Sequence, residues 1–195
     1  MYQFYYGTLK AKYGDKVKLC YTDTDSLLVE IQTDDINADL IKMANKFDFN
    51  DYSSDHPIRQ ALGDKIKANK KVPGTFKDEC EGKVITEFIG LRPKMYSLIK
   101  VGDDVNKPKD GIRKAKGVPS KIVKKEFNHE RYRKALFDID YNDTVTFQTI
   151  RSDLHHIYSI EVTKVGLAAM DDKKWIDSDN ITMLAHGDYR LQQTR

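Results

Sequence analysis

The chain has 195 residues, with 33 Lys and Arg against 30 Asp and Glu, and its formal net charge is +3. Hydrophobic residues make up 39% and charged residues 32%, which is typical of a globular protein with a heavily charged surface. No run of about 18 apolar residues occurs, so the sequence predicts no membrane span. The two cysteines, Cys20 and Cys80, indicate neither a disulfide framework nor zinc-type spacing, and they favour a reducing, intracellular compartment.

The first elements are predicted from helical spacing and caps. Residues 2–13 carry aromatic or apolar side chains at positions 2, 5, 6, 9 and 13, a spacing that predicts a helix packed against a core. Gly14 follows as the expected C-terminal cap. Two hydrophobic runs separated by a polar break then predict a β-hairpin over residues 18–31.

The rest of the chain predicts short elements of both kinds. Asp34 and Asp35 offer an N-cap to a helix that reaches about residue 47, and residues 50–63 predict a loop. Further on we expect strands at residues 83–90 and 94–101, a polar loop at 102–111, a helix from Pro119 to 127, a helix capped by Asn128 with Tyr132, Ala135 and Leu136 inward, and a hairpin formed by residues 143–151 and 154–165. Runs of strands and helices without regular alternation predict an α+β fold.

The charge is unevenly distributed along the chain. Residues 65 to 134 hold 20 Lys and Arg against 9 Asp and Glu, and the remainder holds 13 against 21. A basic middle beside an acidic part containing the hairpin is what a phosphate-binding track next to a metal site would look like. A solvated charged face is the alternative interpretation of the same pattern.

The tip of the predicted hairpin carries two aspartates, Asp23 and Asp25, separated by one residue. If the backbone stays extended there, both carboxylates point to one side. Close carboxylates repel each other unless a cation lies between them, so the pattern favours a divalent-metal site. An ordinary turn is the alternative, because aspartates are common in turns. A calcium-binding hand is excluded, since Leu27 occupies the fifth loop position.

Three segments then resemble one protein family. Residues 21–26, Tyr-Thr-Asp-Thr-Asp-Ser, closely resemble motif C of family B DNA polymerases, the palm hairpin that holds catalytic Mg²⁺. Residues 91–96, Leu-Arg-Pro-Lys-Met-Tyr, resemble the Lys-x-Tyr motif of the protein-primed members, and residues 115–118, Ala-Lys-Gly-Val, resemble the Lys-Gly-Val segment that follows it. Residues 75–79 and 184–187 are similar to polymerases of Maverick/Polinton-type mobile elements and related viruses. The matches keep the family's order.

The resemblance implies roles for individual residues. Asp25 becomes the direct ligand of Mg²⁺, or of Mn²⁺ as the alternative ion, and Asp23 its less essential companion. Tyr21 and Thr22 would shape the tip near the primer terminus. DNA contacts are implied for Lys94 and Tyr96 on the duplex, and for Lys114, Lys116, Lys121, Lys124 and Lys125 on phosphates. Taken without the resemblance, Tyr96 predicts a half-buried strand residue and the lysines predict solvated surface.

The resemblance also implies an activity and an architecture. We expect a partial polymerase palm over residues 1–117, a thumb-like module over 118–170 and a tail over 171–195. The activity would be that of a DNA-directed DNA polymerase, a nucleotidyltransferase that adds deoxynucleotides to a primer 3′-OH by two-metal phosphoryl transfer. The partners would be primer–template DNA and deoxynucleoside triphosphates.

Two family motifs have no match in the chain. Motif A would supply another metal-binding aspartate and motif B a lysine for the incoming nucleotide, and both lie upstream of motif C. We therefore expect a C-terminal fragment that needs the missing N-terminal polymerase portion and is inactive alone. It would act inside the cell, in the nucleus if it comes from a eukaryotic mobile element. The alternatives are a non-catalytic DNA-binding remnant, or a structural domain whose aspartates only shape a turn.

Other polar residues favour structural roles. His155 and His156 would point to opposite faces of a strand, so they could not chelate one ion. Neither a serine or cysteine nucleophile arrangement nor a phosphate-cradling glycine loop is recognisable.

Overall fold

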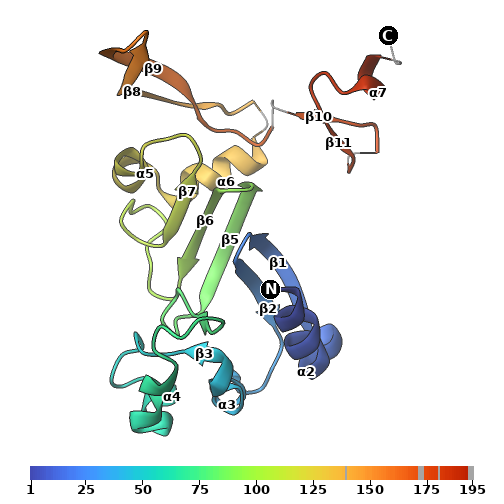
Figure 1. The fold of residues 1–195 in the computed structure, drawn as a ribbon, viewed down its shortest axis with the longest axis vertical. Coiled ribbons are helices and arrows are strands. Elements are labelled where there is room, and N and C mark those ends of the chain that lie inside the picture. The colour runs from blue at the N-terminus through green and yellow to red at the C-terminus, as the bar shows by residue number, and fades with distance from the viewer. Residues whose placement is uncertain (139, 171–173, 180, 193–195) are drawn as a thin grey trace. The chain divides into compact units, whose positions relative to one another are not determined.

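A computed structural model of the protein describes residues 1–138, 140–170, 174–179 and 181–192. It is α+β, as expected, and Figure 1 shows its helices and small sheets. The chain forms two compact units, a first unit of Met1–Thr86 with Lys100–Gly102 and a second unit of Glu87–Ile99 with Asp103–Arg195. In the part of the chain so described, no helix is long and apolar enough to cross a membrane.

The first unit combines a hairpin with short helices. In chain order its elements are α1 (Tyr2–Phe4), the π-helix η1 (Tyr5–Lys10), α2 (Ala11–Tyr13), the 3₁₀-helix η2 (Gly14–Lys16), β1 (Val17–Asp23), β2 (Ser26–Ile31), α3 (Ile36–Lys42), the 3₁₀-helix η3 (Ala44–Lys46), β3 (Phe47–Asp48), α4 (Pro57–Leu62), the 3₁₀-helix η4 (Gly63–Asn69) and β4 (Phe76–Lys77). β1 pairs antiparallel with β2, and β3 pairs parallel with β4.

The predicted N-terminal helix and hairpin are confirmed. The helical segments α1, η1 and α2 follow one another without a break and end at Gly14, whose φ of 57° suits a residue without a side chain. Tyr5 and Leu9 pack with Val17 in a buried cluster. The expected inner face was too wide, however, because Tyr2 and Tyr6 are exposed. The π-helical turn changes the spacing of the face relative to an ordinary helix.

The helix predicted from residue 34 onward begins as expected and ends early. The Asp35 Oδ1 atom accepts a hydrogen bond from the Ala38 N–H (3.0 Å), which caps the start of α3. α3 ends at Lys42 instead of near residue 47. The loop predicted for residues 50–63 was partly wrong, because α4 forms within it. Pro57 occupies the first turn of α4, and the imidazole of His56 accepts a hydrogen bond from the Ile58 N–H.

The remaining elements belong to the second unit, except for the two ends of the β5–β6 hairpin that lie in the first. They are β5 (Ile85–Arg92), β6 (Met95–Lys100), β7 (Ile112–Ala115), α5 (Ser120–Glu126), α6 (His129–Phe137), β8 (Asp143–Asp153), β9 (His156–Leu167), β10 (Lys174–Ile176), β11 (Met183–Ala185) and α7 (Tyr189–Gln192). The sheet order is β5-β6-β7, and β8-β9 and β10-β11 form two-stranded ribbons.

Most sequence predictions for these elements are confirmed, with three differences. β7 was not predicted, because the short, basic segment Ile-Arg-Lys-Ala becomes a strand only by pairing with β6. Leu136 was expected inward but is 41% exposed. His155 lies in the turn between β8 and β9 with a φ of 69°, so it is not a strand residue paired with His156 on an opposite face.

One face of the β5–β6–β7 sheet is covered by α5 and α6. Ile89, Met95 and Ala115 from the sheet pack with Phe127 and Tyr132 from the helical region in one buried cluster. The Tyr132 hydroxyl also donates a hydrogen bond to the Lys114 carbonyl oxygen (3.1 Å). α5 and α6 therefore support one face of the sheet, and the side chains on the opposite face are not part of this cluster.

Candidate functional site

The aspartate hairpin has a tight two-residue turn. Asp23 is the last residue of β1 and pairs with Ser26, the first residue of β2. Between them, Thr24 has a φ of 56°, and the Asp25 N–H donates a hydrogen bond to the Asp23 carbonyl oxygen (2.7 Å). The backbone does not stay extended from Asp23 to Asp25, so strand alternation does not set the directions of the two carboxylates. The turn sets them instead.

Short hydrogen-bonding side chains stiffen this tip. The Thr22 hydroxyl donates to the Ser26 carbonyl oxygen (3.1 Å), and the Ser26 hydroxyl donates to the Asp23 carbonyl oxygen (3.2 Å). The Thr24 hydroxyl donates to the Asp23 carboxylate (3.2 Å). Asp25 is exposed and Asp23 is half-buried. The tip thus presents Asp25 to solvent on a hydrogen-bonded turn.

The donor set of the tip fits part of a magnesium site. Mg²⁺ is commonly held by one or two carboxylates, with water and substrate phosphates as the other ligands. Asp23 and Asp25 offer that number of carboxylates. Within the described residues, no group of three or more His, Cys, Asp or Glu side chains could hold a metal ion. A cation held by these two aspartates would take its remaining ligands from water, from substrate phosphates or from other protein groups.

The β5–β6 turn holds Lys94 in an unusual backbone conformation. Pro93 and Lys94 connect the two strands, and Lys94 has a φ of 60°. A turn with proline first and a positive φ second normally takes glycine or asparagine at the second position. A lysine there costs about 1–2 kcal/mol of backbone strain. The turn places Lys94, which is exposed, at the end of the sheet.

The register of β6 and β7 brings the two predicted DNA-contacting motifs together. Tyr96 pairs directly with Lys114, and the Lys116 N–H donates a hydrogen bond to the Lys94 carbonyl oxygen (2.9 Å). Directly paired residues share a face of the sheet and have Cβ atoms about 4.5–5.5 Å apart. The three lysines are exposed and Tyr96 is half-buried. Segments that are about twenty residues apart in the sequence thus form one surface.

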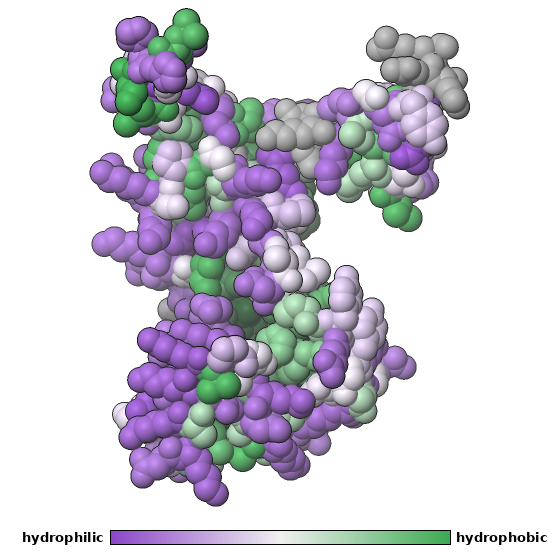
Figure 2. Space-filling view, in the orientation of Figure 1, coloured by the Kyte–Doolittle hydropathy of each residue, from purple (hydrophilic) through white to green (hydrophobic). Residues whose placement is uncertain are grey.

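α5 (Ser120–Glu126), which follows β7 in the chain, carries three more of the predicted lysines. Lys121, Lys124 and Lys125 are exposed, and because Lys124 and Lys125 follow Lys121 by three and four residues, each lies beside Lys121 on the helix. Val123 on the other side is buried in the core of the second unit. Figure 2 shows hydrophilic side chains over the region of β7 and α5. We call Lys94, Tyr96, Lys114, Lys116, Lys121, Lys124 and Lys125 the lysine surface.

The structure adds one residue that sequence reasoning missed. A Cβ atom built on Gly117 would lie 2.5 Å from the Nζ atom of Lys164 on β9. The Lys164 ammonium therefore sits directly over the backbone of the Lys-Gly-Val segment, and glycine leaves room for it. Gly117 also has a φ of 85°, which favours glycine. Only the fold of the β8–β9 ribbon places Lys164 here, since no motif in the sequence marks it.

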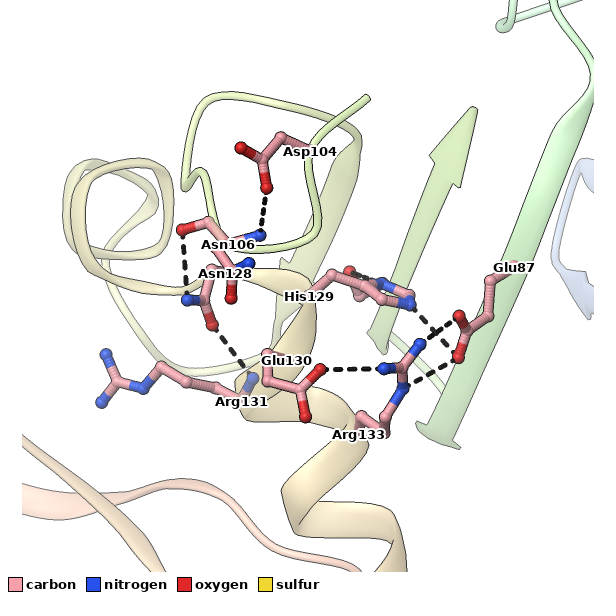
Figure 3. Close-up of polar contacts among 9 residues, drawn as sticks. Glu87, Asp104, Asn106, Asn128, His129, Glu130, Arg131 and Arg133 are labelled. Atoms are coloured by element: carbon pink, nitrogen blue, oxygen red, sulfur yellow. Dashed lines mark hydrogen bonds and ion pairs between the residues drawn. The ribbon is translucent and has the colours of Figure 1, made fainter. Parts of the chain in front are cut away.

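A polar network anchors α6 to the β5–β6–β7 sheet (Figure 3). Arg133 binds the Glu87 carboxylate on β5 and also donates a hydrogen bond to Glu130 (3.0 Å). The His129 Nδ1 atom lies 2.8 Å from the Ser97 hydroxyl on β6, and His129 Nε2 lies 3.6 Å from Glu87. Burial lowers the pKa of His129, and the Arg133 guanidinium lowers the pKa of Glu87.

The Ser97–His129–Glu87 arrangement, which the sequence did not reveal, is structural. Ser97 and His129 are both 0% exposed, so no substrate can reach the serine hydroxyl. The Asn128 side chain adds a cap by accepting a hydrogen bond from the Arg131 N–H (3.0 Å). The network therefore fixes α6, and with it the sheet that carries Lys94 and Tyr96.

The strained turn yields a first testable prediction. Replacing Lys94 by glycine is expected to keep or raise the free energy of unfolding, by up to about 1 kcal/mol, because glycine adopts the positive φ without strain. The same change is expected to weaken duplex DNA binding several-fold, because one ammonium group is lost. Urea unfolding and fluorescence anisotropy measure the two effects. Lys109→Gln, which removes an exposed charge from the loop before β7, is the control. Equal DNA affinities of the two variants would contradict the prediction.

Comparisons with protein-family models, with curated proteins and with solved structures found no match to this chain.

Proposed function

We propose that the chain binds primer–template DNA as the palm and thumb part of a protein-primed family B DNA polymerase. The observation that carries the proposal is the pairing of Tyr96 with Lys114, together with the hydrogen bond from Lys116 to Lys94. The residues that resemble the Lys-x-Tyr and Lys-Gly-Val motifs are thereby neighbours on one surface. Such proximity is expected of two motifs that serve the same ligand.

The chemistry of the lysine surface suits the sugar–phosphate backbone of a duplex. Lysine ammonium groups act as point charges toward phosphates and carry no sequence information. Tyr96 adds a rigid side chain with a polar tip, and its ring lies 5.9 Å from that of Phe88. A surface of this kind would bind DNA of any sequence, and template-directed synthesis requires binding of that kind.

The aspartate hairpin would provide the catalytic part of this function. Asp25, exposed on the turn, would be the main carboxylate ligand of Mg²⁺, with Asp23 beside it. When bound, the metal would polarise the reacting phosphate oxygens during transfer of a nucleotide to the primer 3′-OH. Tyr21 and Thr22 would keep the tip in shape, since the Thr22 hydroxyl already bridges the two strands.

A second candidate function is DNA binding without catalysis. It is favoured by one observation, that all residues of the lysine surface belong to the second unit and none of them is a metal ligand of the proposed site. Both candidates share the lysine surface, so the binding experiment comes first.

The experiment removes five charges from the lysine surface at once. The variant changes Lys114, Lys116, Lys121, Lys124 and Lys125 to glutamine, and its control changes five other exposed lysines, Lys16, Lys18, Lys42, Lys46 and Lys109. Anisotropy titrations with primer–template DNA give the slope of log affinity against log salt, which is negative. In the first variant this slope is expected to become less steep by about 4. At about 100 mM salt its affinity is expected to fall at least a hundredfold. Equal losses in the two variants would overturn the proposed surface.

A further inference from the structure

A second group of lysines lies in the first unit, outside the lysine surface. η4 and the two residues after it, residues 63–71, read Gly-Asp-Lys-Ile-Lys-Ala-Asn-Lys-Lys. We call them the η4 lysine segment. Its four exposed lysines are Lys65, Lys67, Lys70 and Lys71. Hydrophilic residues dominate the surface over α4, which η4 directly follows in the chain, in Figure 2.

The inner side of the η4 lysine segment is firmly attached to its unit. Ile66 is only 6% exposed and belongs to a buried cluster. The Asn50 amide donates a hydrogen bond to the Ile66 carbonyl oxygen (3.0 Å). The Asn69 amide donates to the carbonyl oxygens of Ala44 (2.8 Å) and Phe47 (3.0 Å). The lysines are thus carried on an ordered frame.

The last lysine of the segment is held in a strained conformation. Lys71 has a φ of 57°, where glycine or asparagine would be favoured. Its N–H donates a hydrogen bond to the Asp48 carboxylate (3.0 Å), and this bond is the main cause of the lowered pKa of Asp48. The hydrogen bond to Asp48 therefore fixes the backbone at Lys71 and with it the place of this exposed lysine.

We propose that the η4 lysine segment is a second contact for the phosphate backbone of duplex DNA, separate from the lysine surface. The proposal rests on the proposed function for the identity of the partner. The charge of the η4 lysine segment is suited to phosphates, since its four lysines stand against a single acidic residue, Asp64. The ion pair between Lys67 and Asp64 (3.5 Å) is solvent-exposed and therefore weak.

The side chains favour a duplex over unstacked bases or a lipid surface. Single-strand binding combines positive charge with aromatic rings that stack on bases, and residues 63–71 contain no aromatic residue. Membrane-surface segments insert exposed apolar side chains, whereas Ile66, the one large apolar residue here, is buried. η4 ends at Asn69, and the Lys70 N–H donates a hydrogen bond to the Lys67 carbonyl oxygen (3.2 Å), so Lys67 and Lys70 are one turn apart. Successive phosphates of one strand are about 3.4 Å apart along the duplex axis, so both lysines can reach the same strand.

The test compares two glutamine variants of the full chain. One changes Lys65, Lys67, Lys70 and Lys71, and the matched control changes Lys16, Lys18, Lys42 and Lys46, which are exposed lysines of the same unit. With a duplex of about 30 base pairs, the salt slope is expected to fall by about 3 in the first variant and to stay within about 1 of the wild type in the control. Thermal unfolding followed by circular dichroism checks that both fold. If the first does not, the variant that retains Lys71 replaces it.

The outcomes separate this proposal from the proposed function. A less steep salt slope in the η4 variant than in its four-lysine control supports a second contact. This holds whether or not the lysine-surface variant also binds weakly. A slope equal to that of the control overturns the proposal, and the lysine surface then stands or falls on its own variant. Loss of binding to phosphatidylserine vesicles with unchanged duplex binding would overturn it in favour of a membrane partner.

Discussion

Replacing Asp25 by asparagine is expected to abolish primer extension, by at least about a thousandfold, in a polymerase that joins this chain to the upstream portion with motifs A and B. A thousandfold loss corresponds to about 4 kcal/mol of transition-state stabilisation. Asparagine keeps the size of the side chain and tolerates turn positions, so the hairpin is expected to fold normally. What is lost is the negative charge that would hold a hard cation in the proposed site.

The matching change at Asp23 is expected to cost less. Asp23 is half-buried at the end of β1, and its carboxylate already accepts a hydrogen bond from Thr24. Single-nucleotide extension with Mg²⁺ measures both variants, and Asp34→Asn, at an exposed aspartate beyond β2, is the control. Wild-type rates for both Asp23→Asn and Asp25→Asn would remove the metal-site assignment.

Replacing Arg131 by methionine is expected to lower the free energy of unfolding by about 3–5 kcal/mol. The Arg131 Nε atom donates a hydrogen bond to the Asp143 carboxylate (2.6 Å), and the guanidinium lies over the Phe127 ring at 4.6 Å. Asp143 is only 7% exposed. Without the arginine, a buried carboxylate would be left unpaired, which is more costly than the loss of the ion pair itself.

A double variant separates these two contributions. Arg131→Met with Asp143→Leu removes the pair without leaving a buried charge, so its loss of stability is expected to be smaller than that of Arg131→Met alone. Urea unfolding followed by circular dichroism measures both. Equal stabilities of the single and the double variant would show that the Asp143 carboxylate is not the cause. The ion pair joins α6 to the base of β8, so its loss would also loosen the frame behind the lysine surface.

Local signals predicted much of the fold. The caps at Asp35 and Asn128, the helix end at Gly14 and the alternating strands of both long hairpins are decided by neighbouring residues, and the structure confirms them. β7 was missed because a four-residue basic strand has no stability apart from its partner β6. α4 was missed because its cap is a histidine, a residue that is uncommon in this role.

In the candidate site, too, local sequence patterns predicted some residues, and contacts between distant elements placed the others. The motifs indicated the aspartates and most of the lysines, because these residues are close together in the sequence. Lys164 and the Ser97–His129–Glu87 network depend on contacts between distant elements, which no local pattern reveals. The left-handed conformation of Thr24 at the hairpin tip was also beyond the pattern, since threonine seldom adopts it.

The measurement that tests the central claim most directly is an anisotropy titration of the wild-type chain with primer–template DNA across a range of salt. We expect binding at about 50 mM salt and a linear fall of log affinity with log salt, with a slope of about −5 or steeper, as at least six lysine–phosphate contacts require. No binding at about 50 mM salt, or an affinity that does not change with salt, would contradict the assignment of this chain as a DNA-binding polymerase part.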